Sequence, residues 1–237
     1  MRTTFGSLNT ANSGLFASRK ALDITSHNIA NANTEGYSRQ ILKQRASMPI
    51  WGDTRGIMGT GVETYNIERI RNEYLDKKYW NQSRALGEWQ IKQQNLENLE
   101  SIFNEPSSTG LRQVIDEFFL ALDELSKKTG DSTCRVAVVE TANTLANSIN
   151  RNGNEIIRAI RETNEEVKSK VDEINSLASQ IAILNKQIFN MELGDSKAND
   201  LRDQRNVLID KLSKIIDINV STTKDKNDNE YLSIDIG

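Results

Sequence analysis

Apolar residues recur at every seventh position near the start of this chain, and a small residue follows three positions after each of them. The apolar series is Leu8, Leu15, Leu22 and Ile29, and the small series is Ala11, Ser18, Thr25 and Ala32. An apolar repeat of this length with small partners is typical of a coiled-coil helix that lets another helix approach closely. The pattern predicts a helix from near Ser7 to about Asn31.

A longer series with the same spacing lies in the second half of the chain. It consists of Val139, Ala146, Gly153, Ile160, Val167, Ile174, Ile181 and Ile188. The spacing predicts one long helix that reaches Met191. Shorter helices are expected at about 70–103, 111–130 and 198–216, with a break at 104–110 and a helix start at Asp131 or Ser132. In the last of them, the residues expected on the buried side are Leu201, Val207, Leu208, Leu212 and Ile215.

The helical period is lost between Tyr37 and Arg69. Glycines cluster at 56–61, and 62–67 alternates between apolar and polar residues, which predicts a β-hairpin-like excursion. The tail alternates at 218–221 and 231–236, like two strands. We therefore expect a mainly α fold: a long-helix coiled-coil bundle with a small β-hairpin-like excursion and the start of a C-terminal β domain.

Composition supports long helices and gives little sign of nucleic acid or membrane binding. Charged residues make up 27% and aromatic residues 6% of the 237 positions, with only 2 prolines. The net charge is −3, and no apolar run is long enough to cross a bilayer. The first 60 residues hold seven Arg or Lys and three acids, which is +4 and leaves −7 for the rest.

The residues that most often carry chemistry are scarce. His27 is the only histidine and Cys134 the only cysteine, and no local motif brings them together as a nucleophile and base. Cys134 beside Arg135 could have a lowered pKa, but a small residue in the first turn of a helix is the simpler interpretation. Gly56, Gly59 and Gly61 lack the frame of a phosphate-binding loop. We expect no enzyme activity, cofactor or metal site.

Two motifs resemble a known family. Asn28-Ile29-Ala30-Asn31-Ala32-Asn33-Thr34-Glu35-Gly36-Tyr37 resembles the N-I-A-N-x-x-T-x-G-Y signature of the axial proteins of the bacterial flagellum: the rod, hook and hook-associated proteins. The continuation Tyr37-Ser38-Arg39-Gln40 most resembles that of the hook-associated members. Residues 198–208 resemble their N-D-L-x-D-Q-R-D-x-L motif, with Asn206 in place of Asp. Without the resemblance, 198–208 is a capped amphipathic helix in which Asp203 and Arg205 pair with neighbours.

The resemblance implies a structural adaptor at the hook–filament junction, outside the cell, exported by the flagellar secretion channel without a cleaved signal. The implied partners are copies of itself in a ring, the hook protein, the second junction protein and an export chaperone that binds the C-terminal end. Residues expected in the assembly interface are Leu8, Ala11, Leu15, Leu22, Asn28, Ile29, Asn31, Asn33, Gly36, Tyr37 and Arg39.

The expected segments are an N-terminal assembly helix (1–36), an extended or hairpin segment (37–69), a long-helix bundle (70–216) and the start of a truncated β domain (217–237). The chain resembles the N-terminal portion of a longer protein, and alone we expect it not to assemble. Its first helix has no evident partner within the chain, so we expect that helix to be disordered or detached in the monomer. The alternatives are a rod or hook subunit of the same family and a cytosolic coiled-coil adaptor.

Overall fold

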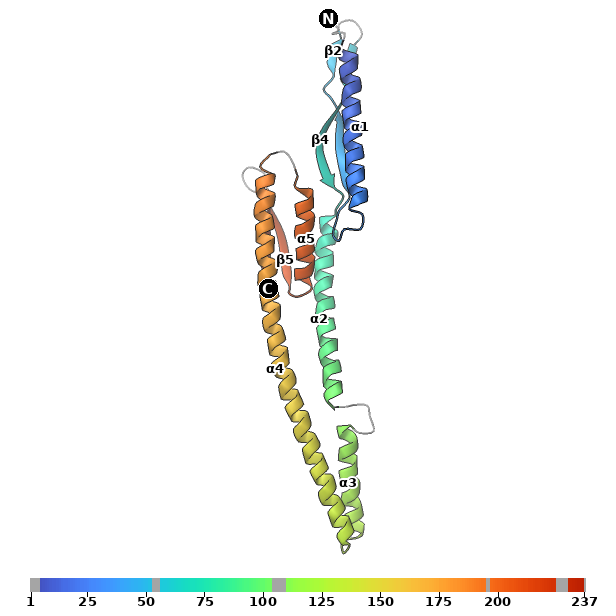
Figure 1. Ribbon diagram of the computed structural model, residues 1–237, viewed down its shortest axis with the longest axis vertical. Coiled ribbons are helices and arrows are strands. Elements are labelled where there is room, and N and C mark those ends of the chain that lie inside the picture. Colours follow the sequence, from blue (N-terminus) through green and yellow to red (C-terminus); the bar gives the residue numbers. More distant parts are fainter. Residues whose placement is uncertain (1–4, 53–55, 104–109, 195–196, 225–229, 237) are drawn as a thin grey trace. The chain divides into compact units, whose positions relative to one another are not determined.

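The computed structural model describes residues 5–52, 56–103, 110–194, 197–224 and 230–236. Within these ranges the chain forms five helices (Figure 1): α1 (Gly6–Ala30), α2 (Glu73–Phe103), α3 (Leu111–Lys127), α4 (Ser132–Met191) and α5 (Asn199–Ser213). The strands are β1 (Gln40–Ala46), β2 (Ile50–Gly52), β3 (Gly56–Met58), β4 (Val62–Arg69), β5 (Ile218–Lys224) and β6 (Glu230–Ile236). The prediction of a mainly α fold with small strand pairs is confirmed.

The three strand pairs are antiparallel and each has two strands: β1 with β4, β2 with β3, and β5 with β6. The β1–β4 ladder pairs Gln40 with Arg69 at one end and Ala46 with Val62 at the other, with a register shift between Lys43 and Gln44. The hairpin predicted between the first two helices is therefore present. The β5–β6 ladder pairs Ile218 with Ile236, which confirms the two strands expected in the tail.

Local signals explain two of the helix boundaries. The N–H of Thr133 donates to the Asp131 carboxylate at 2.8 Å, so Asp131 caps the start of α4. Asp131 is one of the two residues predicted for the start of this helix. Helix α5 ends three residues earlier than predicted. There the N–H of Ile215 donates to the carbonyl of Leu212 at 3.0 Å, a tighter turn that leads the chain towards β5. The predicted break at 104–110 falls mostly on 104–109, which lie outside the described residues.

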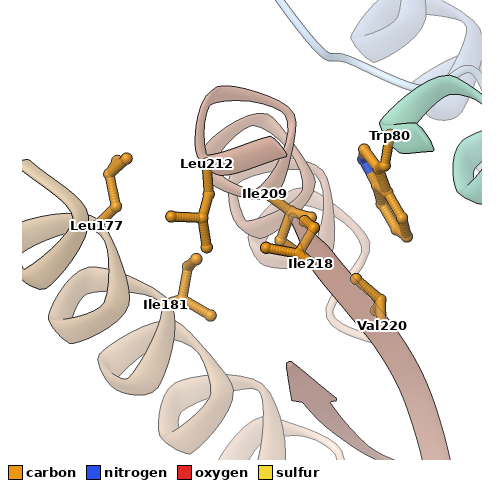
Figure 2. Packing of buried hydrophobic residues seen from close by; sticks show 7 residues of the cluster. All are labelled: Trp80, Leu177, Ile181, Ile209, Leu212, Ile218 and Val220. Atoms are coloured by element: carbon orange, nitrogen blue, oxygen red, sulfur yellow. The ribbon is translucent and has the colours of Figure 1, made fainter. Parts of the chain in front are cut away.

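The chain divides into two compact units, residues 1–85 with 174–237 and residues 86–173. The first unit holds the hydrophobic core (Figure 2), which comprises Trp80, Leu177, Ile181, Ile209, Leu212, Ile218 and Val220. These side chains come from α2, α4, α5 and β5, and Ile209 is completely buried. Complete burial of an Ile or Leu side chain stabilises a fold by about 1.5–3 kcal/mol. The division of the chain into four segments, 1–36, 37–69, 70–216 and 217–237, stays a prediction.

The seven-residue series of α4 is buried at its C-terminal end. Ile181 and Ile188 have exposed fractions of 4% and 2%, whereas Ile160 and Val167, within residues 86–173, are 58% and 57% exposed. The series therefore contributes to the hydrophobic core only through its C-terminal residues, which belong to the first unit together with α5 and β5.

Candidate functional site

The apolar series of α1 lies on one exposed face of the helix. Leu8, Leu15, Leu22 and Ile29 have exposed fractions of 61%, 69%, 67% and 72%, and Ala11 is exposed beside them. We call Leu8, Ala11, Leu15, Leu22 and Ile29 the α1 stripe. Among the described residues nothing covers it. A continuous apolar surface of this kind indicates a binding surface.

The opposite face of α1 packs on the β1–β4 hairpin (Figure 1), so the expectation that this helix has no partner within the chain is wrong. Small residues make the contact. Ala17 is 4% exposed, and the Ser13 hydroxyl accepts a hydrogen bond from the Val62 N–H at 3.2 Å. Gly61 has φ +111° at this contact, and a side chain there would collide with Ser13. The apolar series is conspicuous in the sequence, whereas this small-residue face is not.

Asn28 fixes the direction in which the chain leaves α1. Its Nδ2 donates to the carbonyl of Gln40 at 2.9 Å, and its Oδ1 accepts from the Gln40 N–H at 2.9 Å. The same oxygen accepts from the Tyr37 hydroxyl at 2.8 Å. One amide thereby reproduces a strand-like pair of hydrogen bonds with the first residue of β1. The helix and the hairpin are joined by this side chain.

The turn between α1 and β1 needs the residues of the first motif. Asn31 Nδ2 donates to the carbonyl of His27 at 3.0 Å, and Asn31 Oδ1 accepts from the Thr34 hydroxyl at 3.2 Å. Gly36 has φ +74°, and a Cβ at that position would collide with Cγ2 of Val207 in α5. Only glycine meets both conditions without strain.

The second motif contacts the first. Asp203 of α5 is 4% exposed; its Oδ2 accepts from the Ser38 N–H at 2.8 Å and its Oδ1 from Arg69 Nη1 at 2.7 Å. Ser38 precedes β1, and Arg69 is the last residue of β4. One carboxylate therefore binds both strands of the hairpin at its base, next to the start of β1 and at the end of β4.

Neighbouring residues of α5 extend this contact. Asn199 Nδ2 donates to the carbonyl of Ile67 at 2.9 Å, and Gln40 Nε2 donates to Asp200 Oδ1 at 2.7 Å. Asn199 and Gln40 are both buried, and their side chains also bond to each other at 3.2 Å. We call this set the polar joint; it consists of Ser38, Gln40, Arg69, Asn199, Asp200 and Asp203. It connects α1 and the hairpin to α5 through hydrogen bonds and one buried ion pair.

The predicted interface residues fall into two groups. Leu8, Ala11, Leu15, Leu22 and Ile29 form the α1 stripe, and Asn33 and Arg39 are exposed in the turn. Asn28, Asn31, Gly36 and Tyr37 make the internal contacts described above. Their part in contacts between subunits stays a prediction. Asp203 and Arg205 do pair with neighbours, and Arg205 Nη1 donates to Asn185 Oδ1 at 2.8 Å.

A groove of about 620 Å³ lies beside the polar joint, between α4, α5 and the turn after α1. Its apolar lining consists of Ile183, Leu184, Val207 and Leu208. Its acidic lining consists of Glu35, Asp200 and Asp203, and no Lys or Arg lines it among the described residues. We call it the α4–α5 groove. Tyr37 also lines it, and burial together with Asp200 and Asp203 raises the pKa of its hydroxyl.

The two residues considered for catalysis do not meet in a reactive pair. His27 lies at the end of α1, with Nε2 3.5 Å from Asp200 Oδ1. Cys134 lies in the first turn of α4, where burial and Asp131 raise the pKa of its thiol, contrary to the lowering considered from Arg135. In the described ranges no three His, Cys, Asp or Glu side chains converge as a metal site. No helix in those ranges has the length and apolarity that spanning a membrane requires.

Comparison with known families assigns most of the chain. Residues 96–237 match the profile described as the flagellar hook-associated protein FlgK helical domain. Residues 8–37, which hold the α1 stripe and the first motif, match the flagella basal body rod protein profile. The first of these matches distinguishes the chain from the rod and hook proteins, which were the alternative within the same group.

Two curated relatives agree with the profile match. Flagellar hook-associated protein 1 of Bacillus subtilis is 37% identical over 230 residues, which are 94% of this chain and 45% of that protein. Its counterpart in Salmonella typhimurium is 32% identical over 90% of this chain and 39% of its own length. The solved flagellar hook junction protein FlgK of Burkholderia pseudomallei is 24% identical with a TM-score of 0.48, covering 65% of this chain and 27% of its own.

The chain thus spans less than half the length of these curated relatives. The match to the helical-domain profile covers more than half of the chain, including the α5 residues of the polar joint. The chain belongs to the flagellar hook-associated protein FlgK family.

Proposed function

We propose that this chain supplies the N-terminal assembly part of a structural adaptor at the hook–filament junction of the bacterial flagellum. The observation that carries the proposal is the α1 stripe, an exposed apolar heptad surface on a helix that the hairpin and the polar joint hold in place. A heptad surface binds another helix. Its role is structural, and it requires neither catalysis nor a cofactor.

The partners follow from that role. The α1 stripe would bind apolar helices within the assembled junction, contributed by further copies of the protein. The hook protein would lie on one side of the ring and the second junction protein on the other. Export by the flagellar secretion channel would place the adaptor outside the cell. The export chaperone would bind the C-terminal end of the full-length protein.

Complementation of a motile bacterium that lacks its junction protein tests the proposal. Full-length protein should restore swimming, whereas the double variant Leu15→Asp, Leu22→Asp should not and should shed filament subunits into the medium. The unfolding curve should not change, because both leucines are about two-thirds exposed. Lys20→Asp adds an acid to the same helix outside the α1 stripe and serves as the matched control.

Two outcomes would contradict the proposal. Swimming restored by the double aspartate variant would show that the α1 stripe is not an assembly surface. Retention of the wild-type protein in the cytoplasm, measured by fractionation of the same cells, would instead favour the cytosolic coiled-coil adaptor.

A further inference from the structure

One stretch of α4 consists mainly of residues that form helices poorly. Six of the eight residues at 147–154 are Asn, Ser or Gly: Asn147, Ser148, Asn150, Asn152, Gly153 and Asn154. The side chains of Asn and Ser compete with the helix by bonding to the backbone in other conformations, and Gly loses more conformational freedom on folding than any other residue. All eight residues nevertheless lie within the 60 residues of α4. We call 147–154 the Asn-rich stretch.

Gly153 is the only glycine in α4, and no contact in the described part of the chain requires it. Its backbone is helical, and a Cβ at this position would meet no atom within 4 Å. It therefore serves neither a left-handed conformation nor the close approach of another segment. What remains is its cost, since glycine in a helix interior is less favourable than every residue except proline.

Tertiary packing adds little to the stability of this stretch. Its only apolar side chain, Ile149, is 53% exposed. Its two buried residues are polar: Ser148 and Asn152 have exposed fractions of 7% and 5%. Burial of these side chains gives none of the apolar stabilisation that Ile181 gives to a later turn of the same helix.

Ion pairs support α4 only after the stretch has ended. Glu155 pairs with Arg158 at 3.0 Å, and Lys170 pairs with Glu173 at 2.9 Å. Pairs at this spacing stabilise a helix. Within the described ranges no ion pair includes a residue of the Asn-rich stretch, whose only charged side chain is Arg151.

The helices beside α4 in residues 86–173 end near the same level. The last turns of α2, at Leu99 and Ile102, line a cavity with α4, and on the α4 side this cavity begins at Glu155. Helix α3 is joined to α4 by only four residues, 128–131, so the two helices run antiparallel. The 17 residues of α3 therefore reach back to the level of the 17th residue of α4, which is Ser148. The described parts of α2 and α3 thus stop on either side of the Asn-rich stretch.

We propose that the Asn-rich stretch is a hinge of α4, at which the helix opens locally while the segments on both sides stay helical. Low helix propensity, little apolar burial and the ends of the neighbouring helices all lower the free energy of opening at this point. Opening there would let the parts of α4 before and after the hinge change their angle without loss of the surrounding fold. The inference concerns one chain by itself and does not depend on the adaptor role.

Hydrogen exchange of the full chain, residues 1–237, followed amide by amide, tests the hinge. Each helical amide bonds to the carbonyl four residues earlier, so amides 151–158 report on the carbonyls of the Asn-rich stretch. After correction for the intrinsic exchange rate of each residue, their protection factors should be about tenfold or more below those of amides 139–146 and 161–168. Uniform protection along α4 would overturn the proposal.

Gly153→Ala should raise the protection of amides 151–158 by about fivefold, the factor that corresponds to the roughly 1 kcal/mol by which alanine exceeds glycine in helix propensity. Amides 161–168 should not change. Ser169→Ala, at an exposed position of the same helix, is the matched control and should leave amides 151–158 unchanged. An equal rise at both sets of amides in Gly153→Ala would mean that they exchange through global unfolding, and no rise at 151–158 would mean that Gly153 does not control opening. Either result would contradict the hinge.

Discussion

The carboxylate of Asp203 accepts a hydrogen bond at 2.8 Å from the backbone N–H of Ser38, which lies 165 positions earlier in the chain. Its other oxygen accepts from Arg69 at 2.7 Å. Both motifs that identify the family thus meet at one side chain. The surroundings are polar, so the connection between the hairpin and α5 depends on hydrogen bonds and charge.

Substitution of Asp203 should loosen this connection. Asp203→Ala leaves the Arg69 guanidinium, itself only 14% exposed, without its carboxylate. Removal of one partner of a buried ion pair costs about 3–5 kcal/mol. We expect the free energy of unfolding, measured by urea denaturation, to fall by that order. Asp217→Ala is the control: its pair with Arg84 is half exposed and should contribute at most about 1 kcal/mol.

Asn28→Asp should weaken the attachment of α1 to β1. The change keeps the oxygen that accepts from Gln40 but replaces the Nδ2 donor with a second oxygen facing the Gln40 carbonyl. An unsatisfied buried carbonyl costs about 1–3 kcal/mol. Hydrogen exchange at the Gln40 amide should become faster. If exchange there matches that in Asn33→Asp, a change at an exposed position of the following turn, Asn28 does not join the two elements.

Gly36→Ala should destabilise the chain for two separable reasons, the positive φ and the collision with Val207. Together we expect about 2–4 kcal/mol, measured as a fall in the free energy of unfolding. Adding Val207→Ala should recover only the steric part. Gly14→Ala, in α1 with no atom near the added methyl, should instead stabilise by up to about 1 kcal/mol. Equal effects at the two glycines would contradict this explanation.

Stability at low pH should depend on Glu192. Burial raises the pKa of its carboxyl, but hydrogen bonds from Arg202 and the Ala198 N–H outweigh this, and the pKa lies below the ordinary 4.5. The folded pKa is depressed, so the contribution of Glu192 is complete above pH 4.5 and is lost as pH falls through the folded pKa. Glu192→Gln should flatten this part of the stability curve. An unchanged curve would exclude the Glu192–Arg202 pair as its source.

Asp210 should behave in the opposite way. Burial raises the pKa of its carboxyl above 3.8, although Trp80 donates a hydrogen bond to it at 2.7 Å. The folded state favours the proton, so the contribution is greatest at low pH and is lost as pH rises through the raised pKa. Asp210→Asn keeps an acceptor for Trp80 and removes the buried charge. At pH 7 it should unfold at the same or a higher urea concentration than the parent, and Asp217→Asn should show no such gain.

Periodicity, together with glycine and cap signals, predicted the helices, the hairpin between the first two helices and the two strands of the tail, whereas the short β2–β3 pair was not predicted. The series from Val139 to Ile188 falls within the 60 residues of α4, because an uninterrupted heptad with no proline leaves few alternatives to helix. The alternation at 218–221 likewise places Ile218 and Val220 in the core. In these elements, local pattern and tertiary packing agree.

The polar joint could not be predicted in the same way. Asn199 and Asp203 are one helical turn apart, which puts them on one face, but nothing local indicates that Ser38 and Ile67 lie opposite. Hydrophobic pattern also misassigned part of α5: Ile209 is fully buried, and the polar residues Asp203, Arg205 and Asn206 are buried beside it, with exposed fractions of 4–6%. Polar residues are buried there because partners distant in sequence satisfy them, and periodicity carries no information about such partners.

The paired hydrogen bonds of Asn28 have a mechanical consequence. They fasten the end of α1 to the first residue of β1, while Ser13 and Gly61 hold the helix against the other end of the hairpin. Helix and hairpin are therefore attached at two points and should move as one rigid body. A rotation of α1 should then be transmitted to Ser38 and Arg69, and through Asp203 to the first turns of α5.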